Sequence, residues 1–195
     1  MINYIESEEH KAAIIEINRP DQLNALNNSV ISAIDRELEE IRSNKNIRSV
    51  IIRGVGQKAF VAGADIKEFQ KFNKEEARTL SITGKERLFD KISNFNKPVL
   101  ACINGYALGG GLELALASHI RIASETAKLG LPECSLGIIP GYGGTQRLGR
   151  IVGVGKAMEM ILTAQMIGAL EAKEIGLVNQ ITDNENILLK SLEIT

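Results

Sequence analysis

The sequence of 195 residues is poor in the side chains that bind metal ions or form disulfides. It contains two cysteines, Cys102 and Cys134, two histidines, His10 and His119, and no tryptophan. Two isolated thiols cannot build a disulfide framework or a zinc knuckle, and we expect both to be buried and reduced. Neither histidine lies in a cluster typical of a metal site or a Ser-His-Asp triad. We therefore expect no metal, and any chemistry must come from carboxylates and the backbone.

The sequence also lacks an excess of charge of either sign. Lys and Arg total 23 and Asp and Glu total 24, so the net charge is -1. A balanced chain has no electrostatic footprint for a nucleic acid backbone or an anionic membrane surface. No apolar run is long enough to span a bilayer, and the start of the chain lacks the basic and apolar regions of a secretory signal. We expect a cytoplasmic protein with no nucleic acid or membrane partner.

The composition is that of a globular protein, with 44% hydrophobic and 24% charged residues, and it predicts a single domain over residues 1–195. Strand and helix patterns alternate along the chain, which predicts an α/β fold with crossovers and a largely parallel sheet. The expected strands cover residues 12–17, 49–54, 98–103 and 120–123. The expected helices cover residues 29–43, 74–95, 143–150, 155–163 and 170–175.

Two turns rich in small residues follow the second and third of these strands. In parallel sheets, ligands bind beyond the carboxyl ends of the strands, so we expect both turns at that edge. Residues 58–67 are mostly small, which suits either a tight turn or the approach of a ligand to the backbone. Residues 109–111 are three consecutive glycines directly before a helix pattern. A helix N-terminus suits an anion or a developing oxyanion, but neither the P-loop nor the dinucleotide-binding spacing is present.

Two glutamates stand near these segments, and each has two interpretations. Glu113 lies in the first turn of the helix that follows the glycines, where it either complements the helix dipole or takes part in chemistry. Glu133 lies among apolar residues and glycines. It is either a partly exposed loop acid or a carboxyl group with a raised pKa, as a general acid requires.

Three motifs, in this order, resemble the crotonase (enoyl-CoA hydratase/isomerase) superfamily. The resemblance covers most of the chain, from Asn18 to Asn179, and it implies a crotonase-like α/β fold, a spiral of ββα units with covering helices. The motifs are Ala62-Gly63-Ala64-Asp65-Ile66, Asn104-Gly105-Tyr106-Ala107-Leu108-Gly109-Gly110-Gly111-Leu112-Glu113, and the segment from Pro132-Glu133 to Gly143-Gly144-Thr145-Gln146-Arg147-Leu148.

The resemblance implies an enoyl-CoA hydratase that adds water to trans-2-enoyl-CoA. The N–H groups of Ala64 and Gly110 would form the oxyanion hole, Glu113 would act as base on the water, and Glu133 would protonate C2. The enzyme would need no cofactor, since coenzyme A is part of the substrate, and would form a homo-oligomer, a trimer or a hexamer. The implied substrate-binding residues are Ala62, Ala64, Asp65, Ile66, Gly109, Gly110, Pro132 and Gly141.

Members of this family usually continue beyond the point where this sequence stops, at Thr195, so the sequence predicts a chain truncated in its C-terminal helical region. Two alternatives to hydration stay open. The chain could catalyse another crotonase reaction, such as double-bond isomerisation or hydration of a branched acyl-CoA. It could also be a non-catalytic acyl-CoA-binding module, if its site were too open to exclude water and align a substrate.

Overall fold

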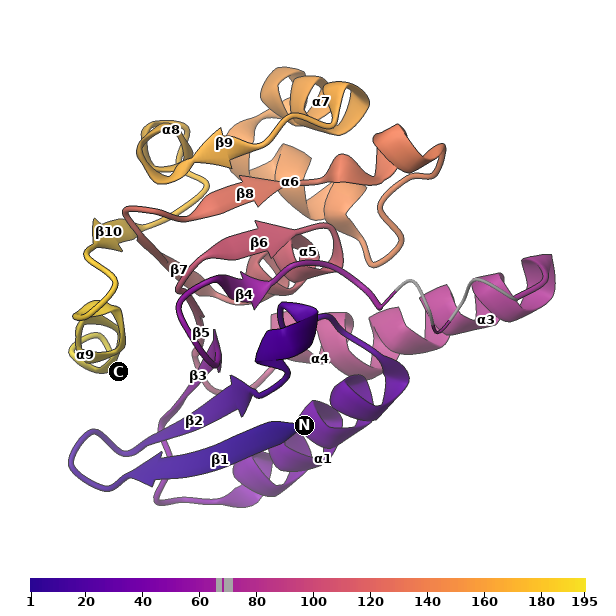
Figure 1. The fold of residues 1–195 in the computed structure, drawn as a ribbon. Helices are drawn as coiled ribbons and strands as arrows, with labels where there is room; N and C mark the ends of the chain where they lie inside the picture. Colours follow the sequence, from indigo (N-terminus) through magenta and orange to yellow (C-terminus); the bar gives the residue numbers. More distant parts are fainter. Residues whose placement is uncertain (66–67, 69–71) are drawn as a thin grey trace.

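The computed structural model describes residues 1–65, 68 and 72–195, and its larger sheet has six strands in the order β1-β2-β3-β5-β7-β10 (Figure 1). β1 and β2 form an antiparallel hairpin, and the pairs from β2 to β10 are parallel. The predicted, largely parallel α/β sheet is therefore confirmed. The strands are β1 Ile2–Ser7, β2 Ala12–Ile17, β3 Ser49–Gly54, β5 Val99–Ile103, β7 Ile120–Ser124 and β10 Gln180–Thr182.

A second, smaller sheet runs in the order β4-β6-β8-β9. β4, β6 and β8 are parallel, and β9 is antiparallel to β8. β4, β6 and β8 each follow a strand of the larger sheet in the chain, so that β3 leads to β4, β5 to β6 and β7 to β8. This repeated step between sheets gives the expected spiral. The strands are β4 Ala59–Val61, β6 Tyr106–Leu108, β8 Lys128–Gly130 and β9 Ile167–Gly168.

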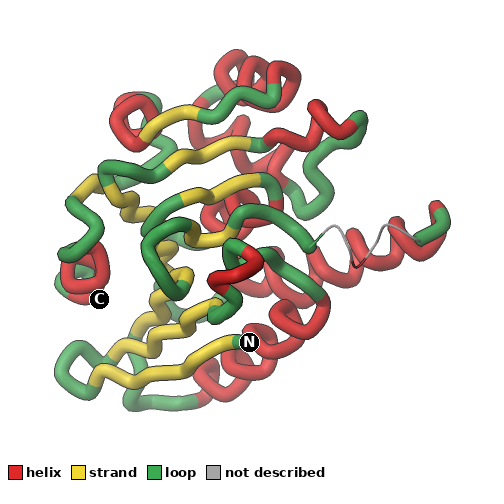
Figure 2. Tube along the Cα trace, in the orientation of Figure 1, coloured by secondary structure: helices red, strands yellow, loops and turns green. Residues whose placement is uncertain are grey.

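Helices cover both faces of the larger sheet, with α1 on one side and α9 on the other (Figure 2). The helical segment predicted over residues 74–95 is formed by α3, a π-helical stretch η2 and α4. The α-helices are α1 Asn28–Ser43, α3 Lys74–Gly84, α4 Lys91–Ser93, α5 Gly110–Ala117, α6 Gly144–Val152, α7 Val154–Thr163, α8 Ala169–Glu174 and α9 Ile187–Leu192. The shorter helical segments are η1 Pro20–Gln22, η2 Lys85–Asp90 and η3 Pro132–Leu136.

Alternate residues of β3 and β5 enter two different apolar clusters. Ile52 and Ala101 join the main core with α1, whereas Ile51 and Leu100 pack with Ile187 of α9. Burial on both faces explains why these strands are almost entirely apolar, since neither face meets water. Of the two thiols, Cys102 is buried here as expected, whereas Cys134 is only partly buried.

The sequence did not predict the short strands of the second sheet. We expected the small-residue turns directly after the second and third strands, but β4 and β6 come first. β4 and β6 have three residues each, too few for a period of two to stand out from the surrounding loop. None of the described helices is long and apolar enough to cross a membrane.

Helix α5 lies against β4 with almost no space between the two backbones. A Cβ atom added to Gly111 would lie 1.9 Å from the carbonyl oxygen of Val61. That contact is far inside van der Waals distance, and backbone atoms on both sides cannot move without displacing the start of α5.

We therefore predict that Gly111→Ala lowers the free energy of unfolding by at least about 2 kcal/mol through overpacking. Gly155→Ala is the matched control, because a Cβ at Gly155 meets nothing within 4 Å and alanine is the better helix former. Urea unfolding measures both variants. Equal stabilities for the two would contradict the close approach of α5 to β4.

Candidate active site

The site lies where three neighbouring strands of the second sheet end. β4, β6 and β8 run side by side in the same direction (Figure 1), so their carboxyl ends meet at one edge. Beyond them the chain continues into residues 62–65, into Gly109 and helix α5, and into Pro132 and Glu133 of η3. The edge predicted to bind a ligand therefore belongs to the smaller sheet.

The N–H groups of Ala64 and Gly110 come together at this edge. A Cβ placed on Gly110 would lie 3.7 Å from the Ala64 nitrogen. Leu26 fixes the Ala64 segment, because its N–H donates to the Gly63 carbonyl at 2.9 Å and its carbonyl accepts from Asp65 N–H at 2.7 Å. Within the described part of the chain, neither Ala64 N–H nor Gly110 N–H has an acceptor. Both donors are thus free to bind an oxygen atom of a ligand.

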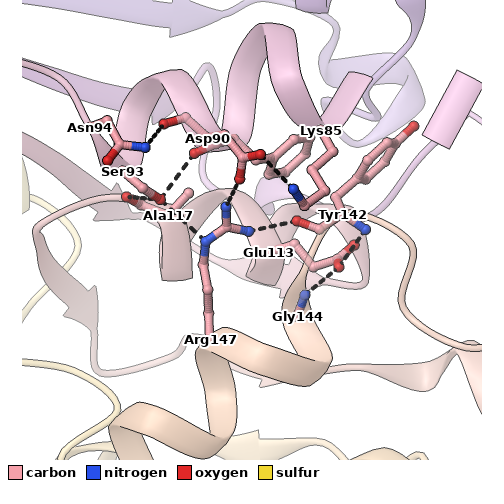
Figure 3. Close-up of polar contacts among 10 residues, drawn as sticks. Lys85, Asp90, Ser93, Asn94, Glu113, Ala117, Tyr142, Gly144 and Arg147 are labelled. Carbon is pink, nitrogen blue, oxygen red and sulfur yellow. Dashed lines mark hydrogen bonds and ion pairs between the residues drawn. The ribbon is translucent and has the colours of Figure 1, made fainter. Parts of the chain in front are cut away.

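The carboxylate of Glu113 is buried, with 1% of the residue exposed. Its Oε1 accepts hydrogen bonds from the N–H groups of Tyr142 and Gly144, both at 2.7 Å (Figure 3). Burial raises the pKa of Glu113 to about 7, and the two N–H donors oppose the rise because they favour the charged form. Complementing the helix dipole is therefore not enough to account for Glu113. A carboxyl group with this pKa can gain or lose a proton near neutral pH.

Glu133 approaches the same helix N-terminus from η3. Its Oε1 lies 2.9 Å from the position of a Cβ on Gly109. Its Oε2 is buried and has no hydrogen-bond partner among the described residues. Burial raises the pKa of Glu133 as well, although the residue as a whole is only partly buried.

The two carboxyl groups interact with each other. The charge of Glu133 is one of the causes that raise the pKa of Glu113, which requires the groups to lie near each other in a poorly solvated place. The site thus combines two carboxyl groups of raised pKa with two free backbone N–H donors.

The remaining predicted site residues have the following surroundings. Ala62 N–H donates to the Leu23 carbonyl at 3.0 Å, and the Asp65 carboxylate pairs with Arg19 at 2.8 Å. The Gly141 carbonyl accepts from the Ser81 hydroxyl at 2.7 Å, and Pro132 opens η3. Ile66 lies outside the described residues.

Sequence reasoning gave no role to Tyr142 and Gly144, although both lie in a quoted motif. Their backbone N–H groups bind Glu113, and backbone donors leave no mark on residue identity. The Tyr142 ring stacks on Phe89, with centroids 4.5 Å apart. Burial raises the pKa of its hydroxyl to about 12. The same contact with Glu113 explains the glycine at 144, since a Cβ there would lie 2.9 Å from Oε1 of Glu113.

The chain matches the family profile described as enoyl-CoA hydratase/isomerase over residues 7–195. It is 46% identical over 192 residues to the short-chain-enoyl-CoA hydratase of Clostridium acetobutylicum, covering 98% of this chain and 73% of that one. It is 45% identical over 186 residues to the crotonyl-CoA hydratase of Syntrophomonas wolfei, covering 95% and 71%. The crystal structure of an enoyl-CoA hydratase from Bacillus anthracis superposes with a TM-score of 0.91 at 43% identity, covering 99% and 74%.

These matches, together with the spiral of two sheets, show that the chain belongs to the enoyl-CoA hydratase/isomerase family. The crotonase-like fold implied by the resemblance is confirmed. Nearly all of this chain is matched, and the chain spans about three quarters of the length of each of these relatives.

The buried Glu113 predicts a pH-dependent stability. Its folded pKa of about 7 lies above the ordinary glutamate value of 4.5, so the native state binds the proton more tightly. The stabilisation is complete below about pH 4.5 and is lost as the pH rises through about 7, a difference on the order of 3 kcal/mol. Glu113→Gln removes this dependence, because a neutral amide oxygen still accepts both N–H groups.

The gain in melting temperature of Glu113→Gln over the unsubstituted protein should therefore be larger at about pH 8 than at about pH 5. Calorimetry at both pH values measures it, with exposed Glu174→Gln in α8 as control. Parallel melting curves for Glu113→Gln and the parent protein across this range would rule out a buried carboxyl with a raised pKa.

Proposed function

We propose that this enzyme, an enoyl-CoA hydratase, uses Glu113 and Glu133 as its acid/base pair and the N–H groups of Ala64 and Gly110 as its oxyanion hole. The observation that carries the proposal is the unequal hydrogen bonding of the two carboxyl groups. Glu113 accepts two backbone N–H donors, which favour its charged form. Oε2 of Glu133 is buried without a described donor, which favours the neutral form.

This difference supports the following roles. The charged Glu113 takes a proton from water, whose oxygen attacks C3 of the trans-2-enoyl thioester. The C2=C3 electrons move toward the thioester carbonyl, and its oxygen becomes negatively charged. The resulting enolate returns its electrons to C2, where the neutral Glu133 delivers a proton. The product is the 3-hydroxyacyl thioester, and the reverse reaction is dehydration with the two roles exchanged.

The N–H groups of Ala64 and Gly110 stabilise the charge that develops on the carbonyl oxygen. Ala64 lies between two hydrogen bonds to Leu26, and Gly110 begins α5. Neither donor therefore needs to reorient as the charge forms, and each such donor is worth about 100- to 1000-fold in rate. Each carboxyl group contributes about 100- to 10,000-fold. No cofactor is needed for these steps, because the thioester itself accepts the electrons.

The backbone around the two donors would hold the thioester and the coenzyme A part of the substrate, through Ala62, Asp65, Gly109, Pro132 and Gly141. The side chains there are small or already engaged, as in the ion pair between Asp65 and Arg19. Two relatives are named for short-chain and crotonyl substrates. A short acyl chain is thus the substrate that we propose, with crotonyl-CoA as the first to test.

We predict that the chain hydrates crotonyl-CoA, measured as loss of the absorbance of the conjugated enoyl thioester. Glu113→Gln and Glu133→Gln should each lower kcat by at least about 100-fold. The double variant should be only slightly slower than the worse single one, because the pair acts as a unit. Glu125→Gln, at an exposed position, is the control and should keep full activity.

Each outcome separates the hypotheses. Thioester binding with no turnover above the double variant would favour the acyl-CoA-binding module. Conversion of crotonyl-CoA to a product other than 3-hydroxybutyryl-CoA, identified by mass and NMR, would favour another crotonase reaction.

We also propose that the chain self-associates. Val154, Met158 and Leu162 are exposed, and their spacing of four residues places them in one apolar row along α7. Exposed apolar rows of this kind often mark protein interfaces.

Sedimentation velocity should detect a trimer or a hexamer, and Leu162→Glu should shift it toward smaller species by placing a charge in the row. Exposed Glu159→Gln, on the same helix but outside the row, is the control. A parent protein that sediments as a monomer at all concentrations would contradict the proposal.

A further inference from the structure

The turn at residues 142–144, which supplies both N–H donors to Glu113, is held in place by one side chain. Arg147, in the first turns of α6, donates from Nη1 to the Tyr142 carbonyl at 2.6 Å (Figure 3). That carbonyl belongs to the same residue whose N–H binds Oε1 of Glu113. Arg147 thus contacts the turn on one side while Glu113 contacts it on the other.

The other nitrogens of Arg147 bind the helical segment that covers the site. Nη2 pairs with Oδ1 of Asp90 at 2.7 Å, and Nε donates to the Ser93 hydroxyl at 3.2 Å. Asp90 ends the π-helical stretch and also pairs with Lys85. The guanidinium therefore joins η2 and α4 to the 142–144 turn, with 13% of its side chain exposed.

The three contacts use the planar shape of the guanidinium. Each nitrogen has a different acceptor, and the acceptors come from three different residues. A lysine ammonium carries one nitrogen and cannot span all three positions at once. The arrangement thus depends on the fork of donors as well as on the positive charge.

We infer that Arg147 is a positioning residue for the reaction: it fixes the 142–144 turn so that both N–H groups point at Oε1 of Glu113, which keeps this carboxylate oriented and ionised. The inference rests on the proposed function of Glu113 as base. Arg147 acts through the turn, and the substrate need not touch it.

Arg147 also acts on Glu113 directly, through its charge. Arg147 lowers the pKa of Glu113 and Glu133 raises it, both through charge. Burial raises the pKa of the Tyr142 hydroxyl, and the charges of Glu113 and Glu68 raise it further. Loss of Arg147 removes a positive charge and loosens two N–H donors, and both changes raise the pKa of Glu113.

The test is Arg147→Gln against Arg150→Gln, which removes the same charge from an exposed position on the same helix. Two quantities are measured: the pH dependence of kcat/KM for crotonyl-CoA hydration, and the titration of the Glu113 carboxyl carbon by ¹³C NMR, assigned by its loss in Glu113→Gln. The NMR titration uses the full chain without substrate, so it reports on Arg147 even if the hydratase proposal fails.

In Arg147→Gln we expect the NMR midpoint and the acidic limb of kcat/KM to move up by about one pH unit. Well below the limb, kcat/KM should fall about tenfold, and above the new midpoint it should recover to within about threefold of the parent value. Arg150→Gln should leave both midpoints unchanged. Arg147→Lys keeps the charge but loses the three separate N–H donors. Its NMR midpoint and its acidic limb of kcat/KM should lie between those of the parent protein and Arg147→Gln.

An unchanged NMR midpoint in a folded Arg147→Gln would overturn the inference, and so would an equal loss of kcat/KM at every pH. Should that variant not fold, Asp90→Asn takes its place. By charge alone, removing the Asp90 carboxylate lowers the pKa of Glu113, whereas a loosened Arg147 raises it. A raised midpoint supports the positioning role, and a lowered or unchanged one contradicts it.

Discussion

The candidate active site is organised around one buried carboxyl group, that of Glu113, near the N-terminal end of α5. A buried carboxylate is costly unless donors satisfy it. Here two backbone N–H groups at 2.7 Å supply the compensation, and neither brings a charge of its own. Burial raises the pKa of Glu113 and the two donors lower it, which leaves it at about 7. Proton transfer near neutral pH requires a pKa in this range.

The arrangement of the two sheets brings the residues of the candidate site together. Because the chain steps from the larger sheet to β4, β6 and β8 in turn, three segments distant in sequence end side by side. One brings Ala64, the next brings Gly110 and Glu113, and the third brings Glu133. Small residues at the junctions let backbone come this close, as at Gly111 against Val61. The proposed catalytic groups thus lie at strand ends and helix starts.

The sequence predicted most of the long elements, but it missed the six-residue strand β1 and the short strands of the second sheet. β3 and β5 were visible as apolar runs, because both of their faces are covered. β4, β6 and β8 could not be recognised in the sequence, because three residues give no periodicity and their pairing is set by neighbours far along the chain. Motif resemblance singled out Glu113 and Glu133, whereas the donors from Tyr142 and Gly144 could not be predicted. A backbone N–H is common to almost every residue, so only the folded turn reveals its direction.

The central claim is that both carboxyl groups act on one water beside a polarised thioester. A crystal structure with a bound acyl-CoA thioester tests it most directly. We expect one water within about 2.6–3.2 Å of both Glu113 and Glu133, with the thioester oxygen held by the N–H groups of Ala64 and Gly110. A thioester oxygen bound elsewhere, or two carboxyl groups that share no water, would contradict it.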